Sequence, residues 1–207
     1  MDFSIVYRVL YEPQKVFESL AGKYKDEGRV LIYATLGVFL LRTIPLLKQE
    51  PFSSLTPLYS ILLLSSMAFM FTLAFLTIPF VESAFVYFVN KRTPSIKFKQ
   101  VFAAVMLCAV PNFLYILLTS VVDYHYFGFG VMFNFIAKSH PFIHGAISIV
   151  TIFFLWTAAL WWFAFGTLFK LNKNTLIVII AALVIFEMLL GGAVSLIQPE
   201  MLMPAPD

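Results

Sequence analysis

The sequence predicts an all-α, polytopic integral membrane protein with five transmembrane helices and a short amphipathic helix near its N-terminus. Of its 207 residues, 61% are hydrophobic and only 12% are charged, which is more apolar surface than a soluble domain of this length could bury. The apolar residues form five long runs, and most basic residues lie beside alternate ends of these runs. The expected membrane helices cover residues 30–47, 58–89, 100–122, 145–169 and 175–197.

The distribution of basic residues predicts an orientation. Eleven of the fourteen Lys and Arg residues lie in the first, third and fifth polar segments. Basic flanks remain in the cytoplasm during insertion, so residues 1–29 are expected inside the cell membrane and the tail, 199–207, outside it. The residues expected to contact lipid head groups are Arg8, Lys15, Lys23, Lys25, Arg29, Lys91, Arg92, Lys97 and Lys99.

The cytoplasmic segment contains one amphipathic helix. Pro13 suits the first position of a helix and Gly22 suits its end. Between them, Val16, Phe17 and Leu20 share one face. Two positions for this helix remain open: it lies in the inner membrane interface, or it packs against the ends of the membrane helices.

Prolines and one short connection predict how individual helices are shaped. The run 58–89 would be about 48 Å long as a helix, beyond the hydrocarbon core, so we expect it to tilt, kink or leave the membrane, with Pro79 as the natural break. Glu82 then belongs to an extension that reaches the inner surface. Pro111 is expected to kink the third helix. The connection 170–174 is long enough only for a tight turn, which makes the last two helices antiparallel neighbours.

Five polar side chains are expected at one level of the membrane. Counted from the inner ends of their helices, Arg42, Asn112 and Glu187 lie at roughly 18–20 Å, and Thr157 and Thr77 lie at about 18 Å. One interpretation is a buried ion pair between Arg42 and Glu187, completed by Asn112. A second is a polar cavity that binds a head group, a small solute or a proton. A third is that Arg42 extends its charged group toward the outer face.

The predicted outer segment contains all three histidines. His140 and His144 are spaced to share a helical face, and with His125 and Asp123 they could hold a divalent metal ion. Pro141 instead favours His140 as the residue just before a helix begins. Histidines at the membrane surface without a metal are therefore the alternative interpretation.

The remaining residues argue against catalysis. The single cysteine, Cys108, lies in an apolar run and forms no intrachain disulfide or thiolate cluster. The chain contains no phosphate-binding loop, zinc-protease motif or nucleophile elbow, and no basic stripe typical of nucleic-acid binding. We therefore expect no enzyme, no cofactor and no nucleic-acid partner. Gly191, Gly192 and Ser195 give the last helix a smooth face for close contact, within the chain or between subunits.

Two short motifs resemble the Yip family of Rab/Ypt-interacting membrane proteins, and prokaryotic members in particular. The first is Leu10-Tyr11-Glu12-Pro13, followed by Phe17, just before the membrane; the second is Pro111 midway along the third helix. The resemblance implies a five-helix membrane protein with a membrane-organising role, and it transfers no catalytic residue.

Two functional hypotheses follow. The first is a non-enzymatic membrane protein that organises membrane or recruits lipids or proteins through its basic cytoplasmic face. Its expected partners are membrane lipids, with a homo-oligomer or another membrane or cytosolic protein as further candidates. The alternative is a small transporter or channel that uses the polar level of Arg42, Asn112 and Glu187.

Overall fold

The structure, a computed structural model, describes residues 4–20, 56–90, 96–121 and 140–197. Each element assigned within these ranges is an α-helix, which confirms the all-α prediction. The helices are α1 (Ser4–Arg8), α2 (Pro13–Leu20), α4 (Pro57–Val89), α5 (Phe98–Cys108), α6 (Val110–Val121), α8 (Pro141–Ser148), α9 (Ile152–Phe169) and α10 (Lys173–Ile197).

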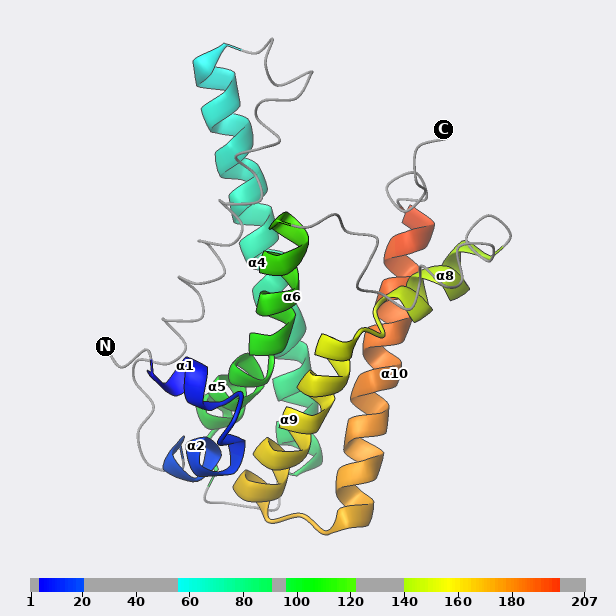
Figure 1. The fold of residues 1–207 in the computed structure, drawn as a ribbon. Coiled ribbons are helices and arrows are strands. Elements are labelled where there is room, and N and C mark those ends of the chain that lie inside the picture. Colours follow the sequence, from blue (N-terminus) through cyan, green and yellow to red (C-terminus); the bar gives the residue numbers. More distant parts are fainter. Residues whose placement is uncertain (1–3, 21–55, 91–95, 122–139, 198–207) are drawn as a thin grey trace.

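Helix α9 is the centre of the bundle. It packs against α5 and α6 on one side, against α10 on another, and against the short helix α2 near its C-terminal end (Figure 1). Helix α4 packs against α5, and α8 packs across α10. Of the buried hydrophobic side chains in the described residues, just over half belong to α5 and α9; one of them, Trp161, meets the ring of Phe154 edge-on at 6.2 Å.

The outer surface of the bundle is apolar. Large side chains such as Phe69 on α4 and Val178 on α10 are about two-thirds exposed. Within the described residues, three helical segments are long and apolar enough to cross a membrane, namely Phe98–Tyr115, Ile152–Phe169 and Lys173–Leu196. The described part of the chain adds a shorter apolar segment, Leu76–Val89. An apolar outer surface of this extent is stable in lipid rather than in water.

The third predicted helix is interrupted where Pro111 predicted a kink. Helix α5 ends at Cys108 and α6 begins at Val110, with Ala109 as the residue between them. Proline has no N–H group and its ring collides with the carbonyl four residues earlier, which accounts for an interruption at this point of the helix. The first predicted membrane helix, 30–47, lies outside the described residues.

The structure differs from the prediction in the fourth apolar run. We expected one helix over 145–169, but α8 ends at Ser148 and α9 begins at Ile152. The hydroxyl of Thr151 accepts a hydrogen bond from the backbone N–H of Phe154 (3.1 Å), so Thr151 caps a new helix inside the run. Hydropathy does not reveal this break because the residues on both sides of it are apolar.

Pro79 does not break α4, contrary to the natural break expected there. The helix runs without interruption from Pro57 to Val89. Downstream of the proline, the hydroxyl of Ser83 donates a hydrogen bond to the Pro79 carbonyl oxygen. This bond is added at the carbonyl of the proline itself, whereas the carbonyl that the proline leaves without an N–H partner lies four residues earlier.

The connection between α9 and α10 is the predicted tight turn, and the two helices are antiparallel neighbours (Figure 1). Lys170 ends α9 in the left-handed region, with a φ of 50°. The side-chain oxygen of Asn172 accepts a hydrogen bond from the N–H of Thr175 (2.8 Å) and caps α10. These local features reverse the chain direction within three residues.

The amphipathic helix α2 packs against the membrane helices, which was the second of the two positions considered. Its apolar residues Val16, Phe17 and Leu20 are fully buried against the bundle, where α2 meets α9 and α5. The short helix α1 precedes α2 and packs against it.

Candidate polar site in the membrane core

Two acidic side chains that lie far apart in the sequence meet inside the bundle. Glu82 on α4 is buried, with 4% of its surface exposed, and Glu187 on α10 is half-buried. Their carboxyl groups lie within hydrogen-bonding reach of each other. We refer to Glu82 and Glu187 as the carboxyl pair.

The inner half of α4 positions Glu82. Pro79, Glu82, Ser83, Val86 and Asn90 are all buried and recur at helical spacing, so they form the face of α4 that points into the bundle. Asn90 ends this face, where its amide donates to the carbonyl oxygen of Val86 (2.8 Å). Packing of α4 against α5 therefore places a carboxyl group in the interior.

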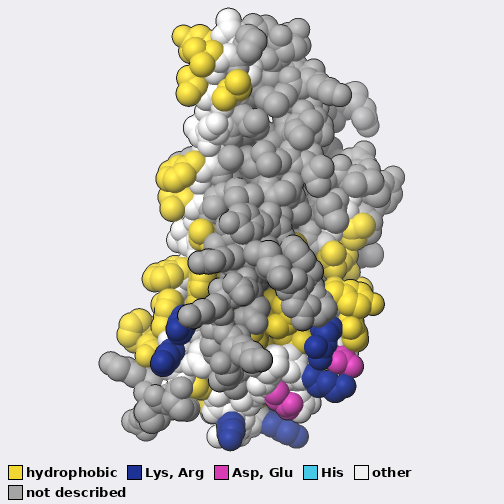
Figure 2. Space-filling model, turned by 90° about the vertical axis from the view of Figure 1, so that its left-hand side faces the viewer, with side chains coloured by type: hydrophobic (Ala, Val, Ile, Leu, Met, Phe, Trp, Pro, Cys, Tyr) yellow, Lys and Arg dark blue, Asp and Glu magenta, His cyan; other side chains and the backbone are white. Residues whose placement is uncertain are grey.

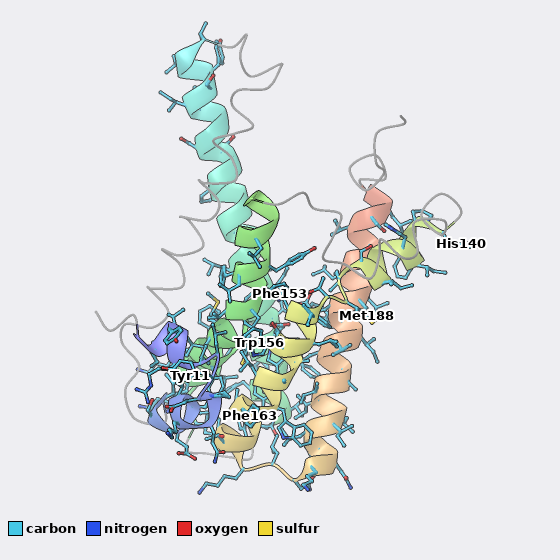
Figure 3. The ribbon with its side chains drawn as sticks, in the orientation of Figure 1. Tyr11, His140, Phe153, Trp156, Phe163 and Met188 are labelled. Atoms are coloured by element: carbon cyan, nitrogen blue, oxygen red, sulfur yellow. The ribbon has the colours of Figure 1, made fainter. Side chains whose placement is uncertain are left out.

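A hydroxyl group from α9 lies at a neighbouring height. Thr157 is 2% exposed and belongs to the buried face of α9. Figure 3 shows Trp156 of α9 and Met188 of α10 at similar heights of the bundle. Thr157 directly follows Trp156 in the sequence, and Glu187 directly precedes Met188. Among the residues that the structure describes, the oxygen Oγ1 of Thr157 and the oxygen Oε1 of Glu82 are buried without a hydrogen-bond partner. Such atoms are uncommon in folded proteins, because each lost hydrogen bond costs about 1–3 kcal/mol.

The other residues of the predicted polar level are distributed differently. Asn112 is half-buried in the first turn of α6, directly after Pro111. Thr77 is exposed on α4, and its hydroxyl donates to the carbonyl oxygen of Leu73 in its own helix (2.7 Å). It therefore contributes nothing to the interior. Arg42 lies outside the described residues.

Glu82 lies in the interior, although we expect it at the inner surface from the sequence. That expectation follows from the length of the apolar run on α4, which is too long for one membrane crossing. A signal was present: Glu82, Ser83 and Asn90 are the polar residues of the inner half of that run, and their spacing places them on one helical face. Counting depth from Asn90 instead of from the run length would have placed Glu82 about 12 Å inside the membrane.

The described basic side chains gather at one end of the bundle. Figure 2 shows Lys and Arg side chains at its lower end, beside the acidic side chains of the N-terminal segment. We call this surface the basic end; its described residues are Arg8, Lys15, Lys97, Lys99, Lys170 and Lys173. The other predicted head-group contacts lie outside the described residues; these are Lys23, Lys25, Arg29, Lys91 and Arg92.

A small ion-pair cluster joins α1 to α2 at the basic end. Glu12 lies 3.1 Å from the Lys15 ammonium group and 3.5 Å from the Arg8 guanidinium group. The hydrogen bond from Lys15 lowers the pKa of Glu12, and the positive charges of Lys15 and Arg8 lower it further. The neighbouring Tyr11 packs its ring on that of Tyr7.

The histidines that the structure describes lie at the start of α8. His140 is the exposed residue that precedes Pro141, as predicted, and His144 is buried in the helix. Asp123 and His125, the other two candidate metal ligands, are outside the described residues. Within the described ranges, no three His, Cys, Asp or Glu side chains lie together as a metal site would need.

Comparison with known proteins supports one family. The sequence pattern of the Yip1 domain matches residues 7–195, which is nearly the whole chain. No curated protein and no solved structure matches it. The chain therefore belongs to the Yip1-domain family of membrane proteins.

Proposed function

We propose that this member of the Yip1-domain family is a non-enzymatic membrane protein that organises membrane by holding anionic lipid head groups, or an acidic protein partner, at its basic end. The observation that carries this proposal is the gathering of the described Lys and Arg side chains at one end of an otherwise apolar bundle (Figure 2). In the orientation expected from the positive flanks, this end faces the cytoplasm.

Docking of α2 supports the proposal. Because Val16, Phe17 and Leu20 are buried in the bundle, they anchor the N-terminal segment against α5 and α9. Arg8 and Lys15 are thereby held beside the basic residues that begin α5. Several basic side chains on one surface attract anionic head groups with about 1 kcal/mol each.

Charge removal tests the proposal. In nanodiscs of mixed anionic and zwitterionic lipid, the double variant Lys97→Gln/Lys99→Gln should lose about 2 kcal/mol of preference for anionic lipid, which is roughly thirty-fold at low ionic strength. Native mass spectrometry of the retained lipids measures this preference. The matched control, Lys97→Arg/Lys99→Arg, should keep it. Equal retention of anionic and zwitterionic lipid by the unmodified protein would contradict the proposal.

A second candidate function is transport of a proton or small solute along the polar level of the membrane. The carboxyl pair favours it, because a structural scaffold does not require two acidic side chains in its interior. In proteoliposomes with an internal pH indicator, this function predicts a proton flux that Glu187→Gln abolishes. A protein without flux under an imposed pH gradient would exclude proton transport.

A further inference from the structure

We propose that Glu82 and Glu187 form a proton-binding site in which the two carboxyl groups share one proton at neutral pH. This inference is independent of lipid binding at the basic end. It also holds whether or not a proton crosses the membrane, because it concerns occupancy of the site and not movement through it.

The first argument is electrostatic. Glu82 is buried, and its carboxyl group is within hydrogen-bonding reach of that of Glu187. Two adjacent carboxylates in an apolar interior repel each other and also lose their hydration. A proton shared between them removes one charge and supplies a hydrogen-bond donor between two groups that otherwise only accept.

The second argument concerns compensating charges. Within the described ranges, the Lys and Arg side chains belong to the basic end, and Figure 2 shows Lys and Arg side chains on the lower part of the surface. No ion pair between a described Lys or Arg side chain and the carboxyl pair is present in these ranges. From α5, the titratable side chain that interacts electrostatically with Glu82 is the thiol of Cys108. Neither the thiol nor its thiolate carries a positive charge. From α9, the polar residue at this height is Thr157. Arg42, the cation considered from the sequence, lies outside the described residues, and the experiment below distinguishes an Arg42 ion pair from a shared proton.

The third argument is unused hydrogen-bonding capacity. Oε1 of Glu82 and Oγ1 of Thr157 are both buried without a hydrogen-bond partner in the described part of the chain. A buried polar atom without a hydrogen bond lowers the stability of the folded protein. The unpartnered oxygen of Glu82 belongs to the carboxyl pair itself and points to a site that accepts a proton.

Carbodiimide labelling tests the proposal on the full-length protein in lipid nanodiscs. A protonated carboxyl in an apolar environment adds across one C=N bond of dicyclohexylcarbodiimide. The acid proton moves to nitrogen, and the O-acylisourea rearranges to an N-acylurea that retains all atoms of both reactants. We expect one adduct per chain at neutral pH, which peptide mapping should locate at Glu82 or Glu187. Labelling should decline as the pH rises, because the ionised pair does not react.

Matched variants separate the carboxyl pair from other acids. Glu82→Gln and Glu187→Gln should each reduce labelling at least ten-fold, because the introduced amide donates a hydrogen bond that favours the ionised form of the remaining carboxyl. Glu18→Gln, which changes an exposed acid at the basic end, should leave labelling unchanged.

Infrared spectroscopy of the unmodified protein gives a readout that needs no variant. A shared proton predicts a carbonyl-stretch band of a protonated carboxyl group at neutral pH. An Arg42 guanidinium that bonds both carboxyl groups predicts that both are ionised, with neither the band nor an adduct at Glu82 or Glu187. That result would overturn the proposal.

Discussion

The hydroxyl of Ser195 in α10 donates a hydrogen bond to the carbonyl oxygen of Pro141 in the first turn of α8, at a distance of 2.7 Å. The approach is this close because the facing residues have almost no side chain. Gly145 of α8 lies directly against Ser195, and Gly191 and Gly192 of α10 lie against Ile149 and Phe142. The smooth face expected on the last helix is therefore used within the chain, where small residues let two helix backbones approach.

Gly145→Ala should destabilise the protein by about 1–3 kcal/mol, because overpacking a close contact forces a backbone shift. The new methyl carbon would collide with the Ser195 oxygen and would lie 2.6 Å from the Gly191 carbonyl oxygen. Thermal unfolding in detergent measures the effect. Gly166→Ala on α9 is the matched control: its nearest neighbour would be 3.5 Å away, so it should be neutral or stabilising by up to about 1 kcal/mol. Equal losses for both variants would contradict the close α8–α10 contact.

Thr151→Ala should cost about 1 kcal/mol of stability, because it removes the side-chain cap of α9. Thr151→Ser retains the hydroxyl and should recover most of the loss. Both substitutions can be compared by chemical denaturation monitored through helical circular dichroism. If the serine variant is as unstable as the alanine variant, the cap hydrogen bond is not the cause.

Lys170→Gly should be more stable than Lys170→Ala by about 1 kcal/mol, because the left-handed conformation at this position strains any residue with a β-carbon. Comparing these two variants cancels the effect of removing the charge, since neither has one. Their unfolding temperatures measure the difference. A more stable alanine variant would show that the turn does not hold residue 170 in the left-handed region.

Lys15→Ala should raise the pKa of Glu12 toward its ordinary value, because the hydrogen bond from Lys15 is the largest cause of its lowering. A carboxyl whose pKa is lower in the folded state stabilises that state at neutral pH, and this contribution is lost as the pH falls through the folded pKa. The stabilisation is small because Glu12 is solvent-exposed. NMR titration of protein labelled with ¹³C at glutamate follows Glu12, with Glu18 as an internal reference. An unchanged Glu12 titration in the variant would contradict the ion-pair geometry.

Local sequence signals predicted the features that depend on a few neighbouring residues. The turn between α9 and α10 was predicted because the polar stretch between two apolar runs is too short for anything else. Pro111 predicted the interruption between α5 and α6, since the missing N–H group acts within its own turn. Residues Val16, Phe17 and Leu20 predicted the buried face of α2 because the opposite face is polar. Each of these features is determined within one or two turns of helix.

Local sequence signals did not predict which face of a helix points into the bundle, because this depends on how the helix is rotated about its axis. Helices α4 and α9 are apolar on all sides, so periodicity does not indicate which face points inward. The count of depth therefore placed Thr77 in the polar level, whereas packing of α4 turns Thr77 outward and Glu82 inward. The sequence also did not predict that α8 and α9 are separate helices. The cap at Thr151 begins α9, but the break is favourable only when α8 packs against α10.

The sequence by itself determined that this chain is a helical membrane protein of the Yip family, because composition, basic flanks and short motifs do not depend on how the helices are rotated. Only the tertiary structure decided that Glu82 meets Glu187. In an apolar solvent, exposure of apolar side chains costs little, so close packing and the pairing of polar groups set the rotation of each helix, and both require the neighbouring helix to be in place.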